Sequence, residues 1–321
     1  MKALKSQYLG ILLLTLLTGC FGSSESTTAT STSTGISYDG VTDAAALTVS
    51  NSATILGGAY QGGQTGNAVG TAASLSNDHE SQSPRILILS QALSNAFRKA
   101  DLTGNHNSGN AAAVNDISNQ VAGSCGGQMS YTGTADDTSR QVYASFTFSN
   151  YCEEATTISG TATASGQTDT TLGFSTLSLS FTALTFSSLG DSFTANGFEI
   201  ITPHTGTTNV SMNMLLRDNA TQLVYQIQSY EMVIIGGTSA VDVSISGRYY
   251  DPTYGFVDIS TPTFLHINNV DYWPASGSIK AVGNNSNATF TSLSNTTYQL
   301  DVDSNGDGTV DSTTTGLWTD L

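Results

Sequence analysis

The densest group of metal-binding side chains in this sequence lies near its C-terminus, where acidic and amide residues occupy alternate positions. Residues 301–311 read Asp-Val-Asp-Ser-Asn-Gly-Asp-Gly-Thr-Val-Asp. A hard cation such as calcium takes several oxygen ligands, and alternate residues of one loop can turn their oxygens towards a common point. The run therefore predicts a calcium site in the last part of the chain.

The same run resembles the calcium loops of EF-hands, dockerins and thrombospondin type-3 repeats, whose shared core is D-x-[DN]-x-D-G. The resemblance implies ligand or turn positions at Asp303, Asn305, Asp307, Gly308, Thr309 (through its carbonyl) and Asp311. Thr314 stands where an EF-hand carries its bidentate Glu, and Asp301 could supply the missing carboxylate. The flanking segments alternate like strands, so the resemblance implies a structural calcium and not a sensor. The alternative is an acidic hairpin turn of the Asn-Gly or Asp-Gly type.

Catalytic patterns are missing from the rest of the chain. The sequence holds no G-x-S-x-G, no H-E-x-x-H and no glycine-rich phosphate loop. Its histidines are scattered, at His79, His106, His204 and His266. Glu153 and Glu154 are neighbours on a predicted strand, where adjacent side chains point to opposite faces. The sequence therefore favours a protein without enzymatic activity.

Three cysteines occur, at Cys20, Cys125 and Cys152. No C-x-x-C motif is present, so a redox role has no support. Cys125 and Cys152 are expected to form one disulfide, because an oxidising compartment outside the cytosol favours pairing. The alternative is two free thiols in a core.

The N-terminus has the layout of a signal peptide. Lys2 and Lys5 precede an apolar run over residues 8–17, which is too short to span a bilayer. The run ends in Leu17-Thr18-Gly19-Cys20, which resembles the bacterial lipobox. The resemblance implies diacylglycerol on the Cys20 thiol, cleavage before Cys20 and acylation of the new amino group. The alternative is a plain signal peptide with a chance cysteine.

The resemblance also implies a localisation in the cell. The residue after Cys20 is Phe21 and not Asp, which in many Gram-negative bacteria holds lipoproteins in the inner membrane. We therefore expect a cell-envelope protein anchored in the outer membrane through its lipid, facing the periplasm or the surface. Two or more acyl chains hold a protein stably on a membrane.

The net charge of the chain limits which other partners it can bind. The formal net charge is −16, and charged residues make up only 11% of the chain, against about a quarter in a typical soluble domain. Such a chain lacks the Lys and Arg that nucleic acid requires. It also lacks the cations that would dock it on anionic lipids.

Composition and periodicity divide the chain into four parts. Residues 1–19 are the signal peptide, and residues 20–36 are the lipidated cysteine and a Ser/Thr-rich tether. Residues 37–124 are a helical and loop segment, and residues 125–321 form an antiparallel β domain that ends in the calcium-type hairpin.

The helical and loop segment contains several weaker signals. A strand is expected over residues 44–49, followed by a short helix capped by Ser50 and then a loop over residues 61–79. An apolar stripe predicts the best helix over residues 84–101, and a weaker helix over residues 111–121.

From Gly126 onward the apolar residues alternate with polar ones, as Val142, Ala144, Phe146 and Phe148 do. Short turns separate these runs, which permits only antiparallel neighbours. We expect an all-β fold with one or two N-terminal helices. Its core would be an antiparallel meander of about a dozen strands, curled into a barrel, half-barrel or sandwich.

The whole layout resembles β-rich bacterial lipoproteins of uncharacterised function, down to the terminal Trp318 and Leu321. The expected function is a non-enzymatic, lipid-anchored binding or scaffold protein of the cell envelope, stabilised by calcium. One form of it is a carrier that holds an acyl chain on the inward faces of strands within 140–234. The alternatives are a surface adhesin or assembly subunit and a periplasmic hydrolase.

Overall fold

The structure is a computed structural model, in which residues Thr34–Leu321 form one compact unit. It describes residues 35–72, 100, 114–153, 156–169, 173–188, 191–236, 239–268, 271 and 273–321.

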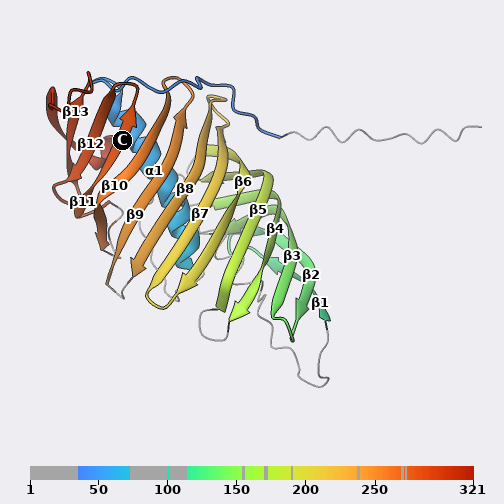
Figure 1. Ribbon diagram of the computed structural model, residues 1–321. Helices are drawn as coiled ribbons and strands as arrows, with labels where there is room; N and C mark the ends of the chain where they lie inside the picture. Colours follow the sequence, from blue (N-terminus) through green and yellow to red (C-terminus); the bar gives the residue numbers. More distant parts are fainter. Residues whose placement is uncertain are drawn as a thin grey trace, which may run out of the picture. The chain divides into compact units, whose positions relative to one another are not determined.

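Most of the unit is a single antiparallel sheet in which each strand pairs with the strands before and after it in the chain (Figure 1). In the described residues β1 and β14 have one neighbour each, so the sheet is not closed. The predicted meander is therefore confirmed, in its open form. The strands are β1 Val114–Ala122, β2 Gly126–Asp136, β3 Gln141–Glu153, β4 Thr156–Asp169, β5 Gly173–Ser188, β6 Asp191–His204, β7 Thr207–Asp218, β8 Val224–Gly236, β9 Ala240–Asp251, β10 Gly255–Asn268, β11 Ser276–Gly283, β12 Ser286–Ser292, β13 Thr297–Asp303 and β14 Ser312–Leu317.

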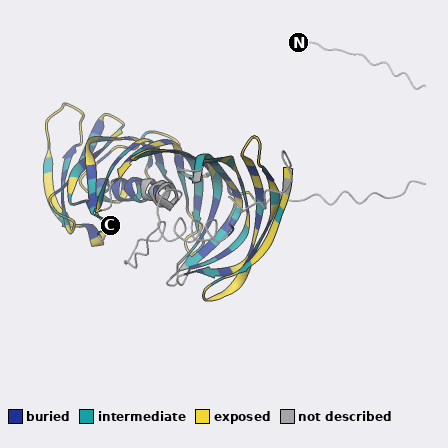
Figure 2. Ribbon diagram, turned by 90° about the horizontal axis from the view of Figure 1, so that it is seen from below, coloured by how far each residue is buried: buried dark blue, intermediate teal, exposed yellow. Residues whose placement is uncertain are grey.

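Alternation gives the sheet one apolar face, which we call the inner face. On β7 it carries Val210, Met212, Met214 and Leu216, all buried, and the residues between them point to the opposite, outer face. The sheet curves around this face, on which many residues are buried (Figure 2). This face provides the core of the unit.

Bulges help to curl the sheet. Ala183 on β5 and Ser229 on β8 have positive φ angles of 52° and 51°, and the strand register shifts at both. Asn196 on β6 accepts the Ala183 N–H at 2.6 Å, and Asn213 on β7 accepts the Ser229 N–H at 2.8 Å. A bulge increases local twist, and here a neighbouring amide side chain satisfies the backbone group that the bulge releases.

The helix α1, Ser52–Ala72, lies against the inner face, mainly on β6–β9, β11 and β12 (Figures 1 and 2). It contains six glycines, which lower its intrinsic helix propensity. Close packing against the sheet compensates for this low helix propensity. A Cβ added at Gly62 would lie 2.9 Å from Cδ1 of Ile227, and the Tyr230 hydroxyl donates to the Ala59 carbonyl at 3.2 Å.

Several predictions for the N-terminal part are wrong. The sequence predicts a loop from residue 61, but α1 continues to Ala72, and at Gly62 it still packs closely against Ile227. It predicts a helix over residues 111–121, but β1 occupies Val114–Ala122 and pairs along its whole length with β2. The helix predicted over residues 84–101 lies outside the described residues, apart from the buried Ala100.

The segment predicted as a strand over residues 44–49 is instead an extended strap that contacts the start of β10, the β11–β12 turn and the start of β12. It forms only one isolated bridge, between Ala44 and Phe256. Ala45 donates to the Phe256 carbonyl at 2.8 Å and accepts from the Asn284 N–H at 2.8 Å. The Leu47 N–H donates to Oγ of Ser286 at 2.8 Å.

Candidate functional site: the inner face and the C-terminal loop

One buried carboxyl lies in the middle of the inner face. β6 turns Phe193, Ala195 and Glu199 inward, whereas Phe198 and Ile200 are partly exposed on the outer face. Glu199 is 1% exposed, and its Oε1 atom has no hydrogen-bond partner in the described part of the chain. A carboxyl removed from water without a partner costs free energy. Stability therefore does not account for a glutamate at this position.

The register places Glu199 in a row of small and apolar residues. The row runs across the inner face from β2 to β8 through Gly133, Ala144, Ala164, Leu179, Glu199, Met212 and Tyr230. Tyr230 lies under α1, at one end of the row. Towards β2 the side chains shrink to alanine and glycine, so they rise least above the sheet over β2–β4.

Methionine adds an adaptable lining to the same face. Apart from Met1, every methionine of the chain is buried on the inner face, at Met129, Met212, Met214 and Met232. The unbranched thioether side chain fits irregular apolar partners and is common on surfaces that bind varied apolar ligands. Two of the four lie beside Glu199 on β7, where Met212 pairs with Glu199 and Met214 pairs with Gly197.

No charged side chain faces Glu199 from the neighbouring elements that the structure describes. α1 and β5 contain no charged residue. On β7, Arg217 points outward and donates to Asn219 at 3.4 Å, and Asp218 accepts the Ala220 N–H at 2.8 Å at the far end of the strand. Burial therefore raises the pKa of Glu199 well above its ordinary value. The other buried inward glutamate, Glu153, differs because it accepts a hydrogen bond from the Tyr151 hydroxyl at 2.8 Å.

Replacing Glu199 by leucine is expected to raise the free energy of unfolding by about 1–3 kcal/mol at pH 7, since it removes an unpaired buried polar group. The effect should depend on pH. The pKa of Glu199 in the folded protein lies above its value of about 4.3 in the unfolded chain. Between these two pKa values the folded protein binds more protons than the unfolded chain. The wild type therefore loses stability as the pH rises from the unfolded pKa to the folded pKa.

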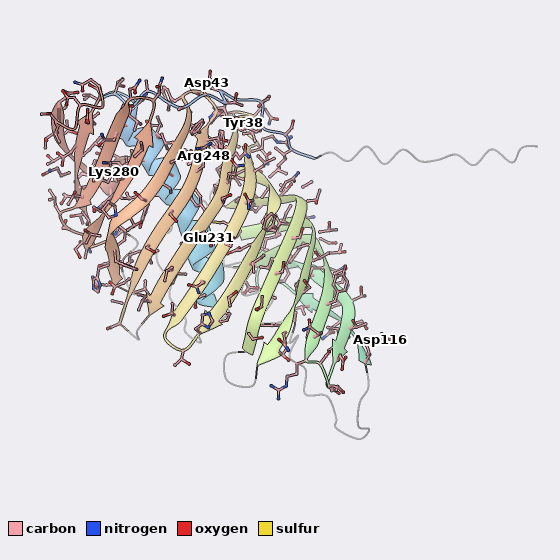
Figure 3. All side chains as sticks on the ribbon, in the orientation of Figure 1. Tyr38, Asp43, Asp116, Glu231, Arg248 and Lys280 are labelled. Atoms are coloured by element: carbon pink, nitrogen blue, oxygen red, sulfur yellow. A yellow bond between two sulfur atoms is a disulfide. The ribbon has the colours of Figure 1, made fainter. Side chains whose placement is uncertain are left out.

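Urea unfolding of both proteins between pH 4 and 8 measures this difference. The gap between Glu199→Leu and the wild type should widen with pH and then level off. Glu231→Leu is the matched control, because Glu231 is exposed on the outer face of β8 (Figure 3). A constant or shrinking gap would show that the Glu199 carboxyl is satisfied in the folded protein.

The C-terminal loop between β13 and β14 is wound around its own polar side chains. The Asp303 carboxylate accepts the N–H groups of Gly306 at 2.7 Å and Gly308 at 2.9 Å. Asn305 accepts the Asp307 N–H, and Asp307 accepts the Thr309 N–H, both at 2.8 Å. The φ angles of Gly306 and Gly308, +72° and +86°, are in the left-handed region that glycine adopts most readily.

The remaining predicted ligands divide into two groups. Asp311 stays in the loop, where its carboxylate accepts both the N–H of Ser304, at 2.8 Å, and the Ser304 hydroxyl. Asp301 does not join the loop in this structure, because its carboxylate accepts from Gln299 at 2.9 Å and from Thr313 at 2.6 Å. No group of three or more His, Cys, Asp or Glu side chains in the described residues is arranged as a ready metal site.

The hydrogen bonds of the loop favour the ionised form of Asp303. Its burial alone would raise its pKa, but the N–H groups of Gly308 and Gly306 and the side-chain amide of Asn287 (2.8 Å) outweigh that effect. The pKa of Asp303 therefore lies below its ordinary value. The loop holds a negatively charged oxygen at the position that the calcium-loop pattern assigns to the first ligand.

The cysteines are the third group of predicted site residues. The sulfur atoms of Cys125 and Cys152 lie at disulfide distance, with Cα atoms 5.1 Å apart, and link the turn before β2 to the end of β3. Cys20 lies outside the described residues.

Polar groups on the outer face are paired with each other. Arg248, labelled in Figure 3, donates to both carboxylate oxygens of Asp258 at 2.7 and 2.9 Å and lies over the Phe256 ring. His266 Nδ1 lies 2.8 Å from Asp242 Oδ1 across two neighbouring strands. These pairs are more than one-third exposed and surround no buried unpaired group.

Sequence reasoning missed Glu199, although a signal for it was present. Phe193, Ala195, Gly197, Glu199 and Ile201 are alternate residues of one predicted strand. A single carboxylate in an otherwise apolar alternation marks either an edge of the buried face or a functional group inside it. Only the strand register shows that Glu199 is central.

No helix in the described residues is both long and apolar enough to cross a membrane. Comparisons with protein-family models, with curated proteins and with solved structures found no match for this chain.

Proposed function

We propose that this protein is a lipid-anchored, non-enzymatic binding protein of the cell envelope that holds an acyl chain on the inner face of its sheet. The observation that carries the proposal is the inner-face row described above, in which small side chains lead up to one unpaired buried carboxyl. An acyl chain would supply the apolar contacts over the small side chains, and its head group would lie at Glu199. The lipobox-like sequence before Cys20 would place the protein at a membrane, where acyl chains are available.

Native mass spectrometry tests this function. A chain that begins at Phe21 contains the whole compact unit and lacks the lipidated cysteine. Purified from bacterial membrane extract, it should carry a non-covalent adduct of lipid mass that organic solvent removes. A protein that stays free of adduct, and that takes up neither palmitic acid nor methyl palmitate, would contradict an acyl-binding function.

We further propose that the C-terminal loop binds calcium through Asp303, Asn305, Asp307, Asp311 and the Thr309 carbonyl, as a structural brace for the β13–β14 hairpin. The low pKa of Asp303 supports this, since a calcium ligand must be ionised. Asp301 would join only if its bonds to Gln299 and Thr313 were exchanged for the metal.

Calcium at 1 mM is expected to stabilise the protein by about 2–3 kcal/mol if its dissociation constant is near 10 µM. Asp303→Ala should abolish this gain, and Asp116→Asn, on the exposed surface of β1, should leave it unchanged. Thermal unfolding with calcium or with EDTA measures the effect. Equal melting temperatures in calcium and EDTA for the wild type would show that the loop is a hairpin turn without a calcium site.

The open sheet favours a second function, that of an assembly subunit. β1 pairs all nine of its residues with β2, and no strand in the described residues pairs with its other edge. Such an edge can accept a strand from another chain. Oligomers in native mass spectra that Ser118→Pro disperses would support this function.

A further inference from the structure

Glu199 indicates what kind of head group the inner face takes. It is buried, its Oε1 is unpaired, and the elements around it supply neither a cation nor a hydrogen-bond donor in the described residues. Its immediate neighbours in the register are Leu179 and Met212, which are both apolar. A ligand that reaches this carboxyl must therefore satisfy it without help from other polar side chains.

The chemistry of a neutral carboxyl selects the partner. A protonated carboxyl has one O–H donor and a carbonyl acceptor side by side. A second carboxylic acid presents the same two groups in the opposite order, so two hydrogen bonds close and no polar atom is left over. An ammonium group would bring three donors to a place with one acceptor group, and it would bury two charges at a large desolvation cost.

We propose that the inner face binds a long-chain carboxylic acid, whose carboxyl group pairs with that of Glu199 and whose chain runs over Leu179, Ala164 and Ala144 towards β2. These three side chains are at most 1% exposed in this structure, so the ligand must displace what covers them. This inference rests on the acyl-binding function proposed above. Four strand spacings separate β6 from β2, a distance of about 19 Å. An extended chain of about 16 carbon atoms has a similar length, given carbon–carbon bonds of about 1.5 Å.

The pairing predicts how affinity responds to pH. Two ionised carboxylates in one apolar site repel each other, so binding should weaken as pH rises. The side-chain amide that Glu199→Gln introduces would still offer a donor and an acceptor and could not ionise. Glu199→Leu keeps the volume and apolar character of the site but offers neither group.

The test measures binding of palmitic acid, methyl palmitate and hexadecylamine to the chain that begins at Phe21, at pH 5 and pH 8. For the wild type, palmitic acid should bind at least tenfold more tightly at pH 5 than at pH 8, and more tightly than hexadecylamine at pH 5. Glu199→Leu should weaken palmitic acid binding at pH 5 by tenfold or more, and Glu199→Gln should retain most of it with a smaller pH dependence. Glu231→Leu is the control and should match the wild type.

The outcomes separate this inference from the proposed function. If the wild type and Glu199→Leu bind palmitic acid equally at both pH values, the acyl site stands and the carboxyl pairing is wrong. Tighter binding of hexadecylamine than of palmitic acid would also overturn the pairing, in favour of a cationic head group. If no variant binds any of the three compounds, the acyl-binding function itself fails. Glu199→Leu is expected to be more stable than the wild type, so loss of binding would not reflect unfolding.

Discussion

Replacing Trp318 by alanine is expected to lower the free energy of unfolding by about 3–5 kcal/mol, the usual cost of removing a large buried aromatic side chain. Trp318 is 1% exposed and begins the short 3₁₀ helix Trp318–Asp320, which Leu321 follows. Its ring stacks on Trp273 with centroids 5.2 Å apart, and it also contacts the rings of Tyr60, Phe290 and Tyr298.

The size of this effect follows from what Trp318 connects. Tyr60 belongs to α1, and Phe290 and Tyr298 belong to β12 and β13, so one side chain joins the helix to the last strands of the sheet. Its Nε1 also donates to the Ser294 carbonyl at 3.0 Å. The substitution would therefore leave a cavity and remove one of the hydrogen bonds to the Ser294 carbonyl, which also accepts from the Ser292 hydroxyl and the Thr297 N–H.

Urea denaturation measures the loss as a shift in midpoint with an unchanged slope. Tyr254→Ala is the control, because Tyr254 is 40% exposed in a turn and its loss should cost less than about 0.5 kcal/mol. If Trp318→Ala costs no more than that control, the C-terminus does not hold α1 on the sheet.

Removing the disulfide with the double substitution Cys125→Ser and Cys152→Ser should cost about 3–4 kcal/mol. The two cysteines are 27 positions apart, and the bond limits the unfolded chain over this loop. It also acts locally. The Cys125 N–H donates to the Cys152 carbonyl at 3.3 Å, and together these contacts fasten the β1–β2 turn to β3.

The local effect of the disulfide can be measured separately by hydrogen exchange. β1 is an edge strand, so hydrogen exchange in β1 and at the start of β2 should accelerate more than exchange in β7 when the bond is lost. Reduction of the wild type should reproduce the effect of the double substitution. A cost under about 1 kcal/mol, with unchanged exchange in β1, would show that strand pairing alone holds this end of the sheet.

The strands could be predicted from the sequence because their signal is local. Alternation in β3 and β7 is plain, and turns such as Asp218-Asn219-Ala220 separate consecutive strands at distances that permit only antiparallel neighbours. The open form of the sheet could not be predicted. Closure depends on bulges such as those at Ala183 and Ser229 and on which edges meet, and neither has a clear sequence pattern.

The structure of the N-terminal part was harder to predict from the sequence, because long-range contacts determine it. The glycines of α1 predict a loop, yet Gly62 is where the helix approaches Ile227 on β8. The apolar residues Val114, Ile117 and Val121 of β1 have helical spacing, and only the pairing with β2 makes this segment a strand. Glu199 was missed for a related reason, since its neighbours Leu179 and Met212 are distant in the sequence.

In the C-terminal loop, by contrast, local sequence determines most of the structure. Its pattern of Asp303, Asn305, Asp307 and Gly308 predicted a calcium loop, with an acidic hairpin turn as the alternative, and in the structure the backbone turns around these polar side chains. The place of Asp301 could not be read from the pattern, because it depends on Thr313 across the β13–β14 pair.

The most direct test of an acyl-binding inner face is photo-crosslinking with a palmitic acid analogue that carries a diazirine near its last carbon. The account predicts saturable labelling that excess palmitic acid suppresses, with adducts on inner-face residues of β2–β4 such as Gly133 and Ala144. Labelling that does not saturate, or adducts centred on outer-face residues such as Phe198 and Ile200, would contradict it.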